Sequence, residues 1–181
     1  MRKLQTSELK RLSIEEFRFK EKIPVTIILD NIRSQNNIGS VFRTSDAFRI
    51  EQLFLCGITA TPPHREIHKT ALGATESVSW QYFADTRQAI DLLKGRGYGI
   101  YCIEQTDQSI PLPDFCPPQS PFAVVFGNEV SGIDEKLLPL CDGAIEIPQF
   151  GTKHSLNVSV AVGIVIWDIL NKFTTKFSAA M

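Results

Sequence analysis

The chain has 181 residues, a net charge of −1 and a sequence pI of about 6.3, so it lacks the overall basic character that most simply indicates nucleic-acid binding. Its 43% hydrophobic and 22% charged residues are typical of one globular domain of ordinary size. The four cysteines form no C-x-x-C pair, which argues against a zinc or redox motif and fits a reducing cytoplasm. The sequence predicts neither a signal peptide nor a membrane span.

The first 23 residues differ in charge from the rest of the chain. Residues 1–22 hold seven Lys or Arg and four Glu, which gives them a local net charge of +3. Within this N-terminal segment, Ser13 and Glu16 have the spacing of a capping box, a pattern that starts many helices. The sequence therefore predicts a short helix in a basic segment ahead of the main domain.

From residue 24 onward, short apolar runs alternate with amphipathic segments. Strands are expected at 25–30, 51–57, 78–83, 98–104, 122–127 and 144–148. Helices are expected at 37–48, 65–74, 85–97, 134–141 and 155–173, with Asn37 and Ser155 as N-caps. The proline-rich stretch 109–121 is expected to be a loop. This alternation predicts an α/β domain with a mainly parallel sheet, in which ligands bind beyond the carboxyl ends of the strands.

Two polar loops after predicted strands hold candidate site residues. In "NIGSVFR" (37–43), Arg43 offers a planar fork of donors suited to phosphate, although on spacing alone a helix cap followed by a surface arginine is the favoured interpretation. In "GNEVSG" (127–132), Glu129 follows a strand and can accept a hydroxyl proton or hydrogen bond. The alternative for this loop is a glycine turn that leads into a helix.

A third polar loop, "IPQFGTKHSLN" (147–157), lies between an apolar strand and a long apolar helix. Capping the helix needs only one side chain, so capping leaves most of the polar residues of this loop unexplained. By itself, His154 is more often a loop histidine than a general base. Other nucleotide-binding and hydrolase patterns, such as G-x-G-x-x-G before a helix, Walker A and H-E-x-x-H, are absent from the sequence.

Together and in this order, the three loops resemble the SpoU/TrmH branch of the SPOUT superfamily, which are RNA ribose 2′-O-methyltransferases. The family motif N-x-G-x-x-x-R is "NIGSVFR" (37–43), and G-N-E-x-x-G is "GNEVSG" (127–132). The third motif is "IPQFGTKHSLNVSVA" (147–161). The resemblance implies a SPOUT domain at 24–173, with a parallel sheet flanked by helices and a C-terminal trefoil knot. The remaining parts are the basic segment 1–23 and a tail at 174–181.

The resemblance also implies a function. Such an enzyme transfers a methyl group from S-adenosylmethionine to a ribose 2′-hydroxyl of tRNA or rRNA and releases S-adenosylhomocysteine. We expect tRNA slightly ahead of rRNA, because the sequence leaves no room for the separate N-terminal RNA-binding domain of larger members. No metal is expected. The resemblance further implies a homodimer, and we expect a cytoplasmic protein without membrane attachment.

The family positions that match this sequence define the expected site. Cofactor-binding positions are Phe126, Gly127, Ile147, Pro148 and Leu156. Catalytic positions are Arg43, Asn37, Glu129, Ser155 and Asn157. Because arginine stays protonated in proteins, Arg43 is expected to clamp the target phosphate and stabilise the developing alkoxide, not to act as a base.

Two other functions remain open, a catalytically inactive SPOUT-like RNA-binding module and a different α/β nucleotide-binding enzyme. The presence of Arg43, Glu129 and Asn157 favours the methyltransferase. The N-terminal segment also has two interpretations. It is either a solvated helix or an RNA contact that acts with basic side chains after the second strand, in which case a chain starting at Lys22 is expected to fold but to bind RNA weakly. Those side chains are His64, Arg65, His68 and Lys69.

Overall fold

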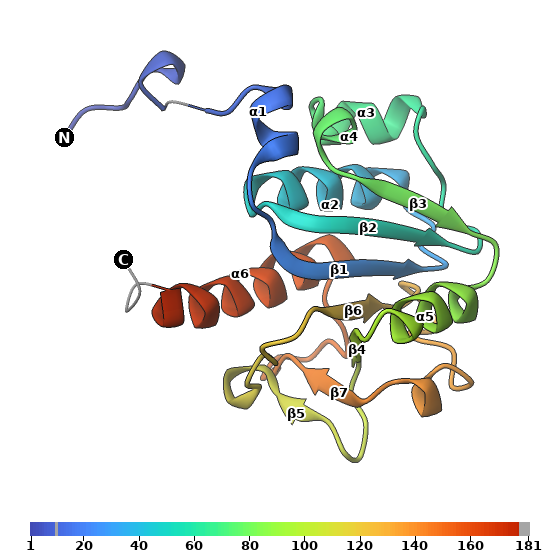
Figure 1. Ribbon diagram of the computed structural model, residues 1–181. Coiled ribbons are helices and arrows are strands. Elements are labelled where there is room, and N and C mark those ends of the chain that lie inside the picture. Colours follow the sequence, from blue (N-terminus) through green and yellow to red (C-terminus); the bar gives the residue numbers. More distant parts are fainter. Residues whose placement is uncertain (10, 178–181) are drawn as a thin grey trace.

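The computed structural model describes residues 1–9 and 11–177 and contains a seven-stranded sheet in the order β3-β2-β1-β6-β4-β7-β5 (Figure 1). The strands are β1 (Ile23–Asp30), β2 (Ile50–Cys56), β3 (Trp80–Phe83), β4 (Gly99–Ile103), β5 (Ile110–Pro111), β6 (Phe122–Phe126) and β7 (Gly143–Glu146). Every pair of neighbouring strands is parallel. The prediction of an α/β domain with a parallel sheet is therefore confirmed.

Helices cover both faces of the sheet. They are α1 (Ile14–Phe19), α2 (Gln35–Ala47), α3 (Arg65–Ala71), α4 (Ala74–Ser77), α5 (Thr86–Gly95) and α6 (Val158–Phe177), with 3-10 turns at Thr6–Leu9, Leu112–Asp114 and Leu138–Leu140. Apolar residues of α2, α3 and α6 pack on one face, and those of α5 pack on the other. The central strands β1 and β6 are buried on both faces, which explains their continuous apolar runs. Among the described residues, no helix is long and apolar enough to cross a bilayer.

Some predicted elements were wrong. The segment expected as a helix at 134–141 forms turns and the single 3-10 turn Leu138–Leu140, since Pro139 lacks the N–H group that an α-helix needs at that position. The expected loop 109–121 contains the edge strand β5 and a 3-10 turn. The expected helix 65–74 ends at Ala71, because Leu72 adopts a left-handed conformation with a φ of 51°.

Two helix caps also differ from the prediction. Helix α2 is capped by Ser34, whose hydroxyl oxygen accepts the backbone N–H of Asn37 at 3.3 Å. Helix α6 starts at Val158, and the side-chain oxygen of Asn157 accepts the backbone N–H of Ser159 at 2.9 Å. Asn37 and Ser155 are therefore not the caps. The side chain of Asn37 instead bonds to Glu129 and Asn157.

The N-terminal segment is attached to the domain. The capping box of Ser13 and Glu16 starts α1 as predicted, and Phe17 on this helix is only 5% exposed within the core. Arg18 donates a hydrogen bond to the backbone oxygen of Glu76 in α4 at 2.9 Å. This packing argues against the expectation that a chain starting at Lys22 folds like the full chain, because truncation removes a buried aromatic side chain.

The expected tail overlaps the last helix. Residues 174–177 continue α6, while residues 178–181 of that tail lie outside the described residues, as does residue 10 of the N-terminal segment.

Candidate active site

A cavity of about 490 Å³ opens at the carboxyl ends of β4, β6 and β7, where the rule for parallel sheets places ligands. Of the expected cofactor positions, Phe126, Gly127, Ile147 and Leu156 line this cavity. Pro148 is not among its lining residues, although both of its neighbours in sequence are. Of the expected catalytic residues, Glu129 and Ser155 line it. We call this space the acidic cavity, because four glutamates line it.

Glu129 binds the backbone at the start of α2. One carboxylate oxygen accepts the N–H of Arg33 at 3.1 Å, and the other accepts the N–H of Ser34 and the side-chain amide of Asn37, both at 3.2 Å. Burial raises the pKa of this carboxyl, but hydrogen bonds from Arg33, its own backbone, Ser34 and Asn37 together outweigh burial, so the pKa lies below its ordinary value. Glu129 is therefore a fully charged carboxylate whose two oxygens are both engaged.

Asn37 joins the first motif to the third. Its side-chain oxygen accepts a hydrogen bond from the amide of Asn157 at 3.1 Å, while its own amide donates to Glu129. The oxygen of Asn157 in turn accepts both the backbone N–H and the hydroxyl of Ser159. A continuous chain of side-chain hydrogen bonds thus runs through Glu129, Asn37 and Asn157, and it brings together residues separated by up to 120 positions in the sequence.

The loop "GNEVSG" is held in shape by Asn128, which sequence reasoning did not select. Its side-chain oxygen accepts the N–H groups of Val130 and Ser131, and its amide donates to the backbone oxygen of Asn31 at 2.6 Å. A Cβ at Gly127 would lie 2.3 Å from the carbonyl carbon of Gly132, so only glycine fits there. The motif therefore needs its first glycine for a close backbone approach.

Glu104 is a second residue that the sequence analysis missed. It follows β4, and one of its oxygens accepts the N–H of Ile133 at 3.1 Å, at the end of the "GNEVSG" loop. A Cβ on Gly132 would approach the same oxygen within 2.4 Å. The sequence could have indicated this residue, because Glu104 is the last residue of a predicted strand and ligands bind at the carboxyl ends of parallel strands.

The lining of the cavity is acidic. Its ionisable residues are Glu104, Glu129, Glu135, Glu146 and His154, and the described lining includes no Lys or Arg. Negative potential in a concave site attracts cationic ligands and repels phosphates. Among the described residues, no group of three or more His, Cys, Asp or Glu is arranged to hold a metal ion.

Arg43 lies elsewhere. It lines a separate cavity of about 540 Å³ between the N-terminal segment, α2 and α4, together with Arg11 and Arg49. We call this the basic cavity. Within the described residues, none of these three guanidinium groups forms a salt bridge. A single chain therefore does not place Arg43 in the acidic cavity beside Glu129 and Ser155, where the sequence prediction had grouped it.

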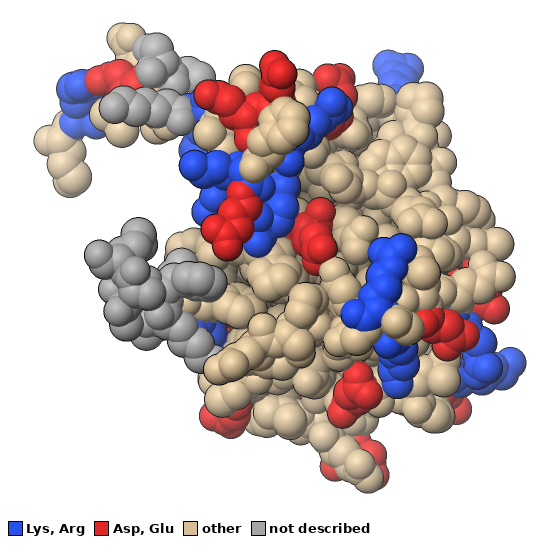
Figure 2. Space-filling model, viewed as in Figure 1, with Lys and Arg blue, Asp and Glu red and all other residues tan. Residues whose placement is uncertain are grey.

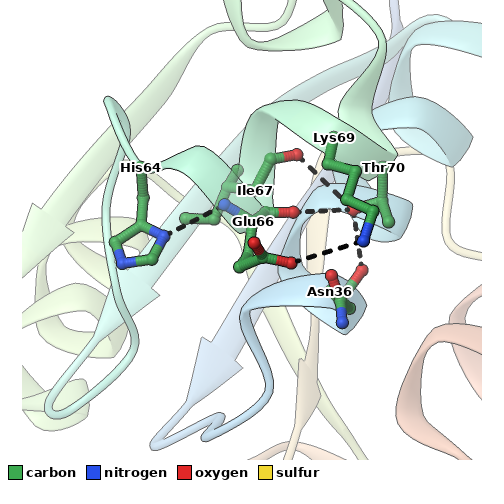
Figure 3. A network of polar contacts seen from close by, with 6 residues as sticks. All are labelled: Asn36, His64, Glu66, Ile67, Lys69 and Thr70. Carbon is green, nitrogen blue, oxygen red and sulfur yellow. Dashed lines mark hydrogen bonds and ion pairs between the residues drawn. The ribbon is translucent and has the colours of Figure 1, made fainter.

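A polar network fixes α3 against the start of α2 (Figure 3). The hydroxyl of Thr70 donates to the backbone oxygen of Asn36 at 3.0 Å, next to the site residue Asn37. Lys69 pairs with Glu66 on the same helix at 3.8 Å. Gly39 permits this contact, since a Cβ there would lie 2.1 Å from the Thr70 hydroxyl oxygen. The first motif thus needs its glycine so that α3 can support α2.

The profile of the SpoU rRNA Methylase family matches residues 24–167, which include all three motifs and the acidic cavity. The chain belongs to the SpoU rRNA methylase family. It is 30% identical to the tRNA (guanosine(18)-2′-O)-methyltransferase of Thermus thermophilus over 166 residues, which cover 91% of this chain and 83% of the relative. It is 34% identical to the 23S rRNA (guanosine-2′-O-)-methyltransferase RlmB of Neisseria meningitidis over 144 residues, or 79% of this chain and 56% of that protein.

Solved structures of this family share the fold. The A. aeolicus TrmH/SpoU tRNA modifying enzyme superimposes with a TM-score of 0.80 at 25% identity, over 94% of this chain and 84% of the other. The SpoU methyltransferase AviRb of Streptomyces viridochromogenes, solved with AdoMet, gives a TM-score of 0.78 at 20% identity, over 90% and 65% of the two chains. At this lower identity the match concerns the fold alone.

We expect Glu129→Gln to lower the free energy of unfolding at neutral pH by about 1–2 kcal/mol, because it replaces a charged acceptor of backbone N–H groups. The folded-state pKa of Glu129 is lowered, so its stabilisation is complete above the ordinary glutamate pKa and is lost as the pH falls through the lower folded value. Urea unfolding of both proteins from pH 7 downward should therefore show their stabilities converging in acid.

Glu135→Gln is the matched control, because this exposed carboxylate lines the same cavity and the described structure gives its side chain no hydrogen bond. Its stability difference from the wild type should be small at every pH. A difference for Glu129→Gln that stays constant from neutral pH to acid would contradict the role assigned to the charge.

Proposed function

We propose that this chain is an S-adenosylmethionine-dependent RNA methyltransferase that modifies a ribose 2′-hydroxyl. The observation that carries the proposal is the hydrogen-bond chain through Glu129, Asn37 and Asn157, which unites the three family motifs beside a ligand-sized cavity. Its relatives are named as methyltransferases of tRNA and of 23S rRNA. Retention of these polar residues makes an inactive RNA-binding module the weaker alternative.

The charge of the cavity matches S-adenosylmethionine better than a phosphate-bearing nucleotide. S-Adenosylmethionine carries a sulfonium and an ammonium group, whereas ATP and NAD carry phosphates that four lining glutamates would repel. Phe126, Ile147 and Leu156 supply an apolar wall for the adenosine, and Gly127 leaves the backbone close to it. When bound, the cofactor supplies an electrophilic methyl group, and S-adenosylhomocysteine is the product.

The remaining polar residues would position the RNA. Ser155 and the amides of Asn37 and Asn157 are suited to hold the ribose hydroxyl in line for attack, since such a transfer depends on alignment. Glu129 keeps these amides in place through its fixed charge. Arg43 would clamp the phosphate of the target nucleotide and stabilise the developing alkoxide.

Calorimetry of the full chain should show binding of S-adenosylmethionine and not of ATP or NAD, and mass spectrometry of RNA nucleosides should show a new 2′-O-methyl signal.

We expect Arg43→Ala to lower turnover by about 100-fold or more, because a lost electrostatic contact to developing charge costs this much. Its affinity for S-adenosylmethionine should be unchanged, because Arg43 is proposed to contact the phosphate of the RNA and not the cofactor. Undiminished methylation by Arg43→Ala would remove it from the catalytic residues.

A homodimer would resolve the separation of Arg43 from the acidic cavity. Helix α6 buries one face in the core, while Val160, Ile164 and Trp167 repeat along its outer face and remain 49%, 38% and 54% exposed. This apolar stripe supports pairing with a second copy of the chain, which is able to bring its own Arg43 to the cavity.

We further propose that the chain forms the C-terminal trefoil knot, which its family membership supports. We also propose a cytoplasmic location, which the four free cysteines support.

We expect the wild type to sediment as a dimer, and Trp167→Glu to shift it toward monomer, because a charge in the apolar stripe opposes burial. If Arg43→Ala and Glu129→Gln are each inactive alone, mixing them should restore measurable activity when each site combines residues of two subunits. A wild type that stays monomeric at all concentrations would exclude the dimer, and a dimer without recovery on mixing would place both residues in one subunit's site.

The basic cavity is suited to RNA phosphates. Figure 2 shows Lys and Arg side chains gathered where α1 leads into β1. Burial and repulsion from Arg49 lower the pKa of the neighbouring Lys22, whereas the charge of Asp46 acts in the opposite direction. Arg49 also has a φ of 51°, a left-handed conformation that costs a non-glycine residue roughly 1–2 kcal/mol. The lining holds three arginines and one aspartate, and none of the arginines forms a salt bridge within the described residues, which supports an anionic partner. We propose that this partner is tRNA ahead of rRNA.

We expect Arg11→Gln and Arg49→Gln each to weaken RNA binding and to reduce the slope of log affinity against log salt by about 1, as loss of one phosphate contact does. Arg87→Gln is the control, because Arg87 is exposed on α5, which covers the other face of the sheet. Filter binding at several salt concentrations measures all three. If the two test variants match the control, neither Arg11 of the N-terminal segment nor Arg49 contacts the RNA.

A further inference from the structure

His154 lines the acidic cavity and has no role in the proposed reaction yet. It lies beside Ser155, in the loop that connects β7 to α6. It is exposed to solvent, and among the described lining residues it is the only imidazole. The other ionisable groups of the lining are the four glutamates, and Lys153 is its neighbour in the chain.

The proposed reaction needs an acceptor for the hydroxyl proton. Arg43 lines the other cavity and its guanidinium stays protonated, so it is unsuited as a base. Both oxygens of Glu129 are engaged by N–H donors, which lowers its basicity. The oxygens of Glu104 likewise accept the N–H groups of Gln105 and Ile133.

We propose that His154 is the general base of the methyl transfer, and this rests on the proposed function. As the bond between the 2′-oxygen and the methyl carbon forms, the bond from methyl carbon to sulfur breaks and leaves its electron pair on sulfur. The hydroxyl proton passes to a ring nitrogen of His154. Because the side chain is exposed, the imidazolium then returns the proton to solvent.

Imidazole suits this step on general grounds. It is the side chain whose ordinary titration falls between about pH 5 and 8, so it can take up a proton and release it in each cycle. Glu135 and Glu146 are the remaining carboxylates of the lining, and they are the rival acceptors that a test has to distinguish.

The test uses the full-length protein with an RNA substrate that the wild type methylates. Under single-turnover conditions with saturating cofactor, we expect His154→Ala and His154→Gln to slow transfer by about 100-fold or more, the usual contribution of a general base. Calorimetric affinity for S-adenosylmethionine and RNA affinity should stay at the wild-type level. We expect the wild-type rate to fall toward acid pH and this fall to disappear in both variants, and added imidazole should restore part of the activity of His154→Ala.

Lys153→Ala is the control, as an exposed neighbour in the same loop, and should transfer at the wild-type rate. Unchanged rates and pH profiles in both His154 variants would overturn the proposal. So would loss of the acid limb in Glu135→Gln or Glu146→Gln with the His154 variants unaffected, because a carboxylate would then be the base. A wild type that binds no S-adenosylmethionine or methylates no RNA would instead overturn the proposed function itself.

Discussion

The site depends on the contact between the Glu129 carboxylate and the backbone N–H groups that precede α2. In this parallel sheet β1 and β6 are neighbours, so their carboxyl ends lie side by side and the loops that follow them meet. Those loops expose backbone donors that need acceptors. One charged side chain satisfies two of them and also orients Asn37. Removal of that charge would therefore disturb both loops and not a single hydrogen bond.

The same residues contribute to folding and to the proposed chemistry. Asn157 accepts the N–H of Ser159 in the first turn of α6 and donates to Asn37, so the start of the last helix is tied to the start of α2. A side chain that caps a helix has little rotamer freedom left. Its amide is thereby held in place before any substrate arrives, and such preorganisation is what an alignment-dependent transfer requires.

Local signals predicted much of the fold. Continuous apolar runs identified β1 and β6 because both strands are buried on two faces, and the spacing of Ser13 and Glu16 identified α1. The prediction of a helix at 134–141 was wrong because it gave more weight to the apolar residues of this segment than to Pro139, which disfavours an α-helix there. Helix caps were misassigned by three residues at α2 and by two at α6, since several polar residues in each loop are able to cap and only tertiary contacts decide which one does.

The site was predicted less completely, because its key relations are long-range. Motifs identified Glu129, Asn37 and Asn157, but no sequence pattern gave the hydrogen-bond chain among them or the separate location of Arg43. Nor did the net charge of −1 indicate nucleic-acid binding. The fold separates the charges into one cavity lined by four glutamates and another lined by three arginines and one aspartate. A cationic cofactor and a polyanionic substrate need opposite potentials, so a near-neutral chain is what one protein that binds both should have.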